Sequence, residues 1–258
     1  MARRRFFVDL FANGKAELHG DEARHAVDVL RVEASQRFEL SDNNSVYLAE
    51  VVSTRKDRVQ FSLVEKLALR PEPVRLWLYV SLVKFDRLEW IIEKGTELGV
   101  ERFVPVEAAR SEKRLADGAR KRMDRWQRVA RSASQQSRRD RLPEILPPVG
   151  LGEALGTEAA YRYFLDEAEG APVLLNVLPL ARNAGDTVAL LTGPEGGWTD
   201  AERADAGGWT TASLGLRILR AETAVLAALA VLSMAWATIA ASVDHNPIDT
   251  QPDGCQRL

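Results

Sequence analysis

The amino-acid sequence predicts an α/β domain with a mostly parallel sheet, preceded by a small β-rich domain. From residue 73 onward, apolar strand-like runs alternate with helical stretches, which is typical of a parallel sheet. Before residue 70, short runs rich in β-branched and aromatic residues are separated by turn sequences such as ANGK and SDNN. The segment RPEP at residues 70–73 carries two prolines between the two patterns, so we expect a linker there.

Residues 1–70 are predicted to form a barrel-like domain. Its expected strands lie in RRFFVDL, RFELSD, SVYLAEVVST and RVQFSLVEKL. One helical stretch, DEARHAVDVLR, interrupts them, with Asp21 as the expected N-cap and with Ala26, Val29 and Leu30 on one face.

Residues 73–243 are predicted to form the α/β domain. VRLWLYVSLV is a continuous apolar run, as expected of a strand covered on both faces, and RFVPVEA, AYRYFLDEA, TVALLTG and TTASLG are further strand candidates. FDRLEWIIEKGTELGV is predicted to be a helix that Asp86 caps and Gly99 ends. The polar residues 244–258 are expected to form a flexible tail.

The composition is that of an ordinary soluble protein, with 46% hydrophobic and 28% charged residues and a net charge of −2. The single cysteine, Cys255, excludes an intramolecular disulfide and a cysteine-based zinc site, and the three histidines are not at ligand spacing. We therefore expect no metal, and a cytoplasmic location fits. The start MARRRFF is followed by residues too polar for an export signal.

Residues 223–243 carry no charge, so by length alone they are a candidate membrane span. Much of this segment is Ala, Ser and Thr, and no basic residue follows closely to set its topology. We therefore favour a helix buried in the protein or in a subunit interface.

The segment TVALLTGPEGGWTDAE has the pattern of a strand, a glycine-rich loop and a helix. Thr199 and Glu202 have the spacing of a capping box at the helix start. Glycines let a ligand approach the backbone N–H groups of such a loop closely, although a plain turn is the alternative. The loop is neither a GxGxxG motif nor a P-loop.

The segment SLGLRILRAETA follows another strand candidate. Its glycine, its apolar residues and its charged rim suit a pocket for an adenine ring and a methionine chain. Arg220 and Glu222 are equally well explained as a salt bridge at the start of a helix.

Residues 110–141 hold 12 Lys/Arg against 4 Asp/Glu, in a chain whose net charge is −2. A segregated basic strip is typical of a partner with a phosphate backbone. The alternative is a solvated helix face. Arg3, Arg4 and Arg5 add to the case for nucleic acid.

Together these motifs resemble the bacterial 16S ribosomal RNA uracil-N3 methyltransferase family (RsmE) of the SPOUT superfamily. The resemblance rests on KFDRLEWIIEKGTELGV, RSEKR, RWQRVARSASQQSRRDRLPEI, LLTGPEGGWTDAE and LGLRILRAETA, together with RRFFV and HAVDVLR. It covers nearly the whole chain except the tail. Leu216 stands where the family usually has proline, and Ala221 where threonine is common.

The resemblance implies a PUA-like RNA-binding barrel, a SPOUT domain with a trefoil knot, which is a rare exception among folds, and a homodimer formed through the C-terminal domain. It implies S-adenosylmethionine as cofactor and 16S rRNA of the small ribosomal subunit as substrate. The implied cofactor contacts are Leu165, Thr192, Gly193, Pro194, Glu195, Gly196, Gly197, Leu214, Gly215, Leu216, Ile218, Leu219 and Thr223.

For catalysis, we expect Arg220 to orient the uracil or stabilise charge on its carbonyl oxygens. Glu195 and Glu222 are candidates to accept the N3 proton or to fix that arginine. Because a sulfonium supplies the electrophile, no metal is required. The expected RNA contacts are Arg3, Arg5, Arg24, Arg31, Arg110, Arg114, Arg138 and Arg139. The alternative is a noncatalytic RNA-binding or ribosome-assembly protein with a relic cofactor pocket.

Overall fold

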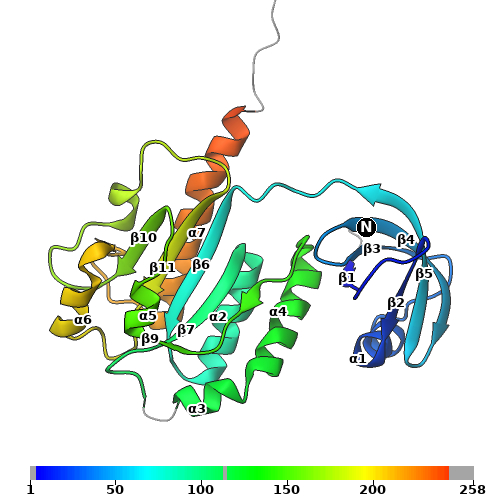
Figure 1. Cartoon of the computed structure of the whole chain (residues 1–258), viewed down its shortest axis with the longest axis horizontal. Helices are drawn as coiled ribbons and strands as arrows, with labels where there is room; N and C mark the ends of the chain where they lie inside the picture. The colour runs from blue at the N-terminus through cyan, green and yellow to red at the C-terminus, as the bar shows by residue number, and fades with distance from the viewer. Residues whose placement is uncertain (1–3, 113–114, 244–258) are drawn as a thin grey trace, which may run out of the picture.

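The structure is a computed structural model, and it describes residues 4–112 and 115–243. It contains two sheets in two bodies that lie side by side, and residues 68–73 connect them (Figure 1). The elements of the first body are β1 (Arg5–Phe7), β2 (Lys15–His19), α1 (Gly20–Arg24), η1 (His25–Val29), β3 (Arg37–Ser41), β4 (Val46–Arg55) and β5 (Arg58–Leu67).

The second body holds the remaining elements in chain order. They are β6 (Val74–Ser81), α2 (Phe85–Glu97), β7 (Val100–Glu107), α3 (Leu115–Arg120), α4 (Met123–Ser137), β8 (Glu144–Ile145), β9 (Val149–Gly150), α5 (Leu151–Leu155), β10 (Tyr161–Leu165), η2 (Leu174–Val177), β11 (Asp186–Thr192), α6 (Asp200–Asp205), η3 (Ala206–Gly208), β12 (Thr210–Ala212) and α7 (Ala221–Val243).

The second sheet has the strand order β12-β10-β11-β6-β7-β8, with β9 paired to β7, and its pairings are parallel. Both faces are covered, as the continuous apolar runs predicted. Along β11, Val188 and Leu190 pack in the core beneath α2, α4 and α7, while Ala189 and Leu191 pack in the core beneath α5 and α6. The predicted α/β domain with a parallel sheet is confirmed; the trefoil knot stays a prediction.

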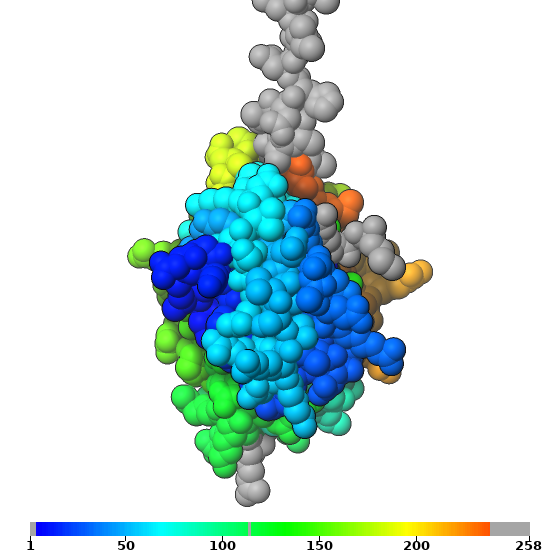
Figure 2. Space-filling model, turned by 90° about the vertical axis from the view of Figure 1, so that its right-hand side faces the viewer, coloured from blue at the N-terminus to red at the C-terminus, as the bar shows by residue number. Residues whose placement is uncertain are grey.

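The first sheet has the order β1-β3-β4-β5-β2 and curls into a half-barrel (Figure 1). Figure 2 looks onto this body, where the dark-blue start of the chain lies beside the lighter blue of the later strands. Phe6, Leu40, Val51 and Phe61 lie in its core. The barrel-like prediction is confirmed, although β2 was not expected from the sequence.

The first helix differs from its prediction. Its N-cap is His19 rather than Asp21, because the helix already begins at Gly20. After Arg24 it widens into the π-helical turn η1, in which the Leu30 N–H donates to the His25 carbonyl (3.1 Å). The wider turn changes the angular spacing of the side chains. Val29 is therefore 64% exposed whereas Ala26 is buried, so the prediction that they share one face was wrong.

The ends of α2 show one wrong and one correct prediction. The N-cap is Lys84 without a side-chain bond, so Asp86 lies inside the first turn, where its charge favours the helix dipole. Gly99 follows the helix with a φ of +95°, the left-handed conformation that glycine adopts without strain. The expected end of the helix is confirmed.

The charge-free segment forms all of α7 after its first turn, and this helix packs on the sheet of the second body. Val225, Leu229, Leu232 and Trp236 are buried against the sheet. At its far end the Trp236 indole N–H donates to the Asp186 carboxylate (2.9 Å). Within the described residues, no helix has the length and apolar character needed to cross a membrane.

The two bodies are joined by a buried ionic network centred on Arg5. Its guanidinium is 4% exposed, donates to Glu39 (2.9 Å) and to the Arg138 carbonyl (2.9 Å), and pairs with Asp140. The Asp140 carboxylate also accepts the Arg70 N–H (2.5 Å). Because Arg5 lies in β1 and Asp140 follows α4, this network fixes the first body against the second.

We expect Asp140→Ala to destabilise the protein strongly, because it leaves the buried Arg5 guanidinium without one of its charged partners. Breaking a buried pair in this way costs about 3–5 kcal/mol. The measurement is the free energy of unfolding by calorimetry. The matched control is Asp200→Ala, which removes a fully exposed carboxylate that pairs with Arg203 and should cost under about 1 kcal/mol. Equal losses in the two variants would contradict a structural role for the network.

Candidate functional site

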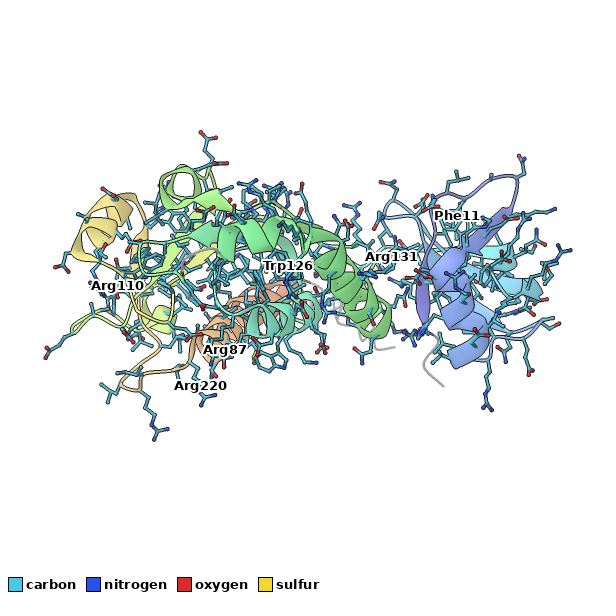
Figure 3. All side chains as sticks on the ribbon, turned by 90° about the horizontal axis from the view of Figure 1, so that it is seen from below. Phe11, Arg87, Arg110, Trp126, Arg131 and Arg220 are labelled. Atoms are coloured by element: carbon cyan, nitrogen blue, oxygen red, sulfur yellow. The ribbon has the colours of Figure 1, made fainter. Side chains whose placement is uncertain are left out.

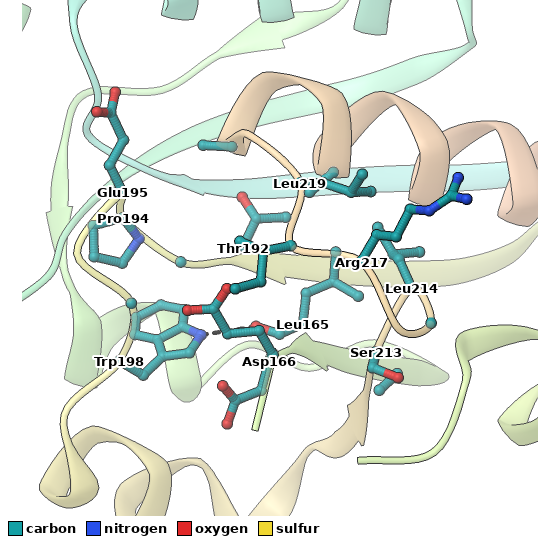
Figure 4. A pocket seen from close by; sticks show the side chains of 18 residues that line it. Leu165, Asp166, Thr192, Pro194, Glu195, Trp198, Ser213, Leu214, Arg217 and Leu219 are labelled. Atoms are coloured by element: carbon teal, nitrogen blue, oxygen red, sulfur yellow. Dashed lines mark hydrogen bonds between the residues drawn. The ribbon is translucent and has the colours of Figure 1, made fainter. Parts of the chain in front are cut away.

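A pocket lies at the carboxyl ends of three neighbouring strands, β10, β11 and β12, which is where ligands bind in open α/β sheets. The loop of residues 193–198, the loop of residues 213–219 and the start of α7 complete its walls (Figure 4). It encloses about 840 Å³, including the part open to solvent.

Trp198 forms one wall of the pocket and ties two strand ends together. Its indole N–H donates to the Leu165 carbonyl at the end of β10 (2.8 Å), and its ring stacks on Phe164 (4.6 Å between centroids). Gly193 at the end of β11 lies so close that an added Cβ would meet the indole at 3.0 Å. A glycine is therefore required there to let the loop close on Trp198.

The loop is also held from outside by two arginines (Figure 3). Arg110 donates to the carbonyls of Gly196 (3.0 Å) and Trp198 (3.2 Å), and an added Cβ on Gly196 would lie 3.1 Å from the Arg110 Cβ. Arg87 of α2 pairs with the Glu195 carboxylate. The loop is thus fastened to α2 and to the segment after β7.

The predicted capping box at the start of α6 is confirmed. The Glu202 N–H donates to Thr199 Oγ1 (3.2 Å), and the Glu202 carboxylate accepts the Thr199 N–H (2.8 Å). The same carboxylate accepts the Ala109 N–H (2.8 Å), next to Arg110. Burial by itself raises the pKa of Glu202, but these backbone donors outweigh it and hold the pKa below its usual value.

Two acidic residues that sequence analysis missed, Asp166 and Glu167, line the pocket immediately after β10. The Asp166 side chain is 4% exposed and is held by Arg203, whose Nε donates at 2.7 Å. In open α/β sheets, ligands bind beyond the carboxyl ends of the strands, and AYRYFLDEA was already a strand candidate. The acidic residues at the end of this strand were therefore a signal that could have been used.

The structure gathers most of the predicted cofactor contacts around this pocket. The predicted contacts that line it are Leu165, Thr192, Gly193, Pro194, Glu195, Gly197, Leu214, Gly215, Ile218 and Leu219. Gly196, Leu216 and Thr223 lie outside the lining, and Leu216 is fully exposed. Gly197 and Gly215 have φ values of +68° and +100°, which explains glycine at both positions.

The three predicted catalytic residues have different surroundings. Glu195 points away from the centre of the pocket towards Arg87 (Figure 4). Arg220 is exposed just before α7 and is not part of the lining. Glu222 lies in the first turn of α7, and one of its carboxylate oxygens is buried without a hydrogen-bond partner among the described residues. The structure gives no Arg220–Glu222 salt bridge.

Two of the predicted RNA contacts, Arg5 and Arg139, are engaged within the protein. Arg5 is occupied in the buried network between the two bodies, so it does not reach solvent. Arg139 donates to the carbonyls of Thr96 (3.0 Å) and Val100 (2.6 Å), and burial lowers its pKa. Both arginines hold protein segments together.

The other predicted RNA contacts are distributed differently. Arg24 and Arg31 are exposed on the first body, and Arg24 pairs with Asp21. Arg110 holds the pocket loop, and Arg138 pairs with Glu39 (3.3 Å). Arg3 and Arg114 lie outside the described residues.

Family models place the chain among RNA methyltransferases. The family described as RNA methyltransferase domain matches residues 70–233, and the family described as RNA methyltransferase PUA domain matches residues 18–64. Ribosomal RNA small subunit methyltransferase E of Bacillus subtilis is 33% identical over 244 residues, covering 89% of this chain and 95% of that protein. The protein of the same name from Mycobacterium bovis is 31% identical and covers 93% and 96%.

Solved structures of two similar proteins have the same fold. A ribosomal RNA small subunit methyltransferase E from Neisseria gonorrhoeae bound to S-adenosyl methionine has a TM-score of 0.81 at 30% identity, covering 91% of this chain and 98% of that chain. A methyltransferase from Legionella pneumophila in complex with the same cofactor has a TM-score of 0.82 at 27% identity, with the same coverage. The chain belongs to the ribosomal RNA small subunit methyltransferase E family.

We expect Arg110→Ala to weaken binding of S-adenosylmethionine, the ligand of the Neisseria relative. The variant removes two hydrogen bonds that hold the loop of residues 193–198. Their loss is worth about 1–2 kcal/mol, or roughly 5- to 30-fold in dissociation constant by calorimetry. The control Arg128→Ala changes an exposed arginine of α4. Unchanged affinity in Arg110→Ala would show that the loop holds its shape without this contact.

Proposed function

We propose that this protein transfers the methyl group of S-adenosylmethionine to N3 of a uridine in 16S rRNA. Residues 73–243 form the catalytic domain and residues 1–70 form an RNA-binding domain of the PUA-like type. Bacterial rRNA is made and assembled in the cytoplasm, so we place the protein there. The observation that carries the proposal is the pocket at the carboxyl ends of β10, β11 and β12, together with membership of the family.

The residues of the pocket fit S-adenosylmethionine. The Thr192 hydroxyl is buried in the lining without a hydrogen-bond partner among the described residues, so it has a donor and an acceptor to offer a ligand. The side chains of Leu165, Leu214 and Leu219 supply apolar surface for a purine ring. The positive φ of Gly215 exposes backbone where a side chain would be strained.

The charges of the pocket also suit this cofactor. Asp166 and Glu167 place two carboxylates in the lining, and the cofactor carries a sulfonium and an ammonium cation. Of the two, Asp166 is already neutralised by Arg203, while Glu167 is exposed at the rim. We therefore assign the attraction of the cationic groups mainly to Glu167.

S-adenosylmethionine, when bound, supplies a methyl carbon that is made electrophilic by the sulfonium sulfur. The uracil N3 carries a proton, which a group of the protein must accept. Arg220, exposed beside the pocket, holds the base and stabilises negative charge on its carbonyl oxygens. The protein thus orients the uracil base and supplies the group that accepts its N3 proton.

Of the two candidate acceptors, we favour Glu222. One of its oxygens is buried and has no partner among the described residues, and the pocket is lined by the adjacent Ala221 and by Ala224. Glu195 is engaged by Arg87 and points away from the centre of the pocket. We assign Glu195 the role of anchoring the loop.

We expect Glu222→Gln to lower kcat by about 10²- to 10⁴-fold, because an amide cannot accept the proton. The dissociation constant for S-adenosylmethionine should change little, as measured by calorimetry. The matched variant Glu195→Gln should keep kcat within about tenfold of the wild type, since it loses one loop contact. Equal kcat losses in both variants, or a Glu222→Gln enzyme of normal rate, would contradict the assignment.

The function itself is tested by mass spectrometry of 16S rRNA nucleosides from a strain that lacks the gene. We expect 3-methyluridine to be lost and to return when the wild-type gene is supplied. In vitro, purified protein should methylate free 16S rRNA or assembled small subunits, and the faster of the two identifies the substrate. Retention of 3-methyluridine in the deletion strain would exclude the proposal.

We also propose a homodimer formed through the C-terminal domain. Leu216 and Ile218 on the loop beside the pocket, and Met234 on α7, are large apolar side chains that are 107%, 84% and 69% exposed. Exposed apolar side chains of this size favour burial in an interface. Met234→Arg should shift the protein towards monomer in analytical ultracentrifugation. An unaltered dimer would exclude Met234 from the interface, and a monomeric wild type would exclude the dimer.

A further inference from the structure

A second concavity lies in the first body, far along the chain from the pocket of the second sheet. It is formed by the turn before β2, the start of β4 and the end of β5, and encloses about 600 Å³, including the part open to solvent. Figure 3 places Phe11, which lines it, at the opposite end of the molecule from Arg220. A ligand held here is therefore not a base that lies in the pocket of the same protomer.

Two aromatic rings form its wall. The Phe11 and Tyr47 rings are 4.7 Å apart between centroids at an angle of 64°. Both side chains are only partly buried, although Phe11 also packs on the core of this body. Partly exposed aromatic rings are the surface on which unpaired bases stack, because every base has a flat π face.

The polar groups around the rings suit the rest of a nucleotide. Lys66 pairs with Tyr47 across the β4–β5 ladder, and its ammonium lies 6.0 Å from the centre of the Tyr47 ring. The Asn13 amide is exposed, and no hydrogen bond of its side chain is found within the described structure. An ammonium binds phosphate, and an amide offers a donor and an acceptor to a base edge. Glu65 is the acidic member of the lining.

We propose that Phe11, Asn13, Tyr47 and Lys66 bind one unpaired nucleotide of the RNA substrate at a distance from the methylated uridine. The base stacks on the Tyr47 ring, which Phe11 contacts edge-to-face, and Lys66 contacts its phosphate. This inference rests on the proposed function, since it takes the substrate to be RNA. It adds that the substrate must present a single-stranded nucleotide to the first body as well as a uridine to the second.

The test is the affinity for a fluorescent single-stranded ribo-oligonucleotide of about 12 nucleotides, measured by anisotropy at several salt concentrations. Tyr47→Leu removes the ring and should weaken binding roughly 5- to 150-fold, the effect of losing one stacked base. Tyr47→Phe keeps the ring and should bind like the wild type. Phe11→Leu should behave like Tyr47→Leu.

Lysine variants test the phosphate contact. Lys66→Gln should weaken binding and lower the slope of log affinity against log salt by about one unit. The matched control is Lys56→Gln, which changes an exposed lysine in the turn between β4 and β5, outside the concavity. Calorimetry with S-adenosylmethionine and a thermal melt establish that each variant is folded.

Three outcomes would overturn the proposal. Normal affinity in Tyr47→Leu and Lys66→Gln would show that no nucleotide binds here. Equal weakening in Tyr47→Leu and Tyr47→Phe would assign the effect to the hydroxyl and not to stacking. Weakened binding to small ribosomal subunits with normal oligonucleotide affinity would identify a protein contact. A wild-type protein that binds the oligonucleotide but never methylates rRNA would defeat the proposed function and leave this site standing.

Discussion

The hydrogen bond from the Trp198 indole to the Leu165 carbonyl holds together two chain segments that meet only in the folded protein. It places the loop after β11 against the end of β10, and the pocket is the space left between them. Gly193 must lack a side chain for the indole to reach, and Phe164 supports the ring from beneath. The contacts of Arg110 hold the same loop from its other side. The site is therefore defined by packing before any ligand is considered.

The arginines of this protein have two different roles, and their hydrogen-bond partners distinguish the two. Arg5 is buried and Arg139 half-buried, and both hold segments together, because a planar guanidinium can satisfy several acceptors at once. Arg110 does the same for the loop at the pocket. Arg31 and Arg128 lie exposed on the first body and on α4. Some arginines of the basic strip, residues 110–141, are thus engaged within the protein. Fewer of its positive charges are therefore available to attract a polyanion.

Short sequence patterns predicted correctly the helix boundaries that depend only on neighbouring residues. The capping box of Thr199 and Glu202 and the helix end at Gly99 follow from a few adjacent residues, and both are present in the structure. The role of Arg5 was not predictable in this way, because its partner Asp140 lies more than a hundred residues along the chain. The concavity at Phe11 and Tyr47 also depends on how β2, β4 and β5 come together. The periodicity of the sequence predicts the strands and helices. Contacts between distant segments decide which charged and aromatic side chains face solvent.

The hydrogen bond between Trp236 and Asp186 joins two elements, α7 and β11, that both reach the pocket. From Asp186, β11 runs about 20 Å to Thr192. From Trp236, the helix α7 runs back about 22 Å to Ala221, so the two sides match in length. They are joined by this bond at one end and border the pocket at the other. A contact about 20 Å from the pocket therefore takes part in positioning two of its walls.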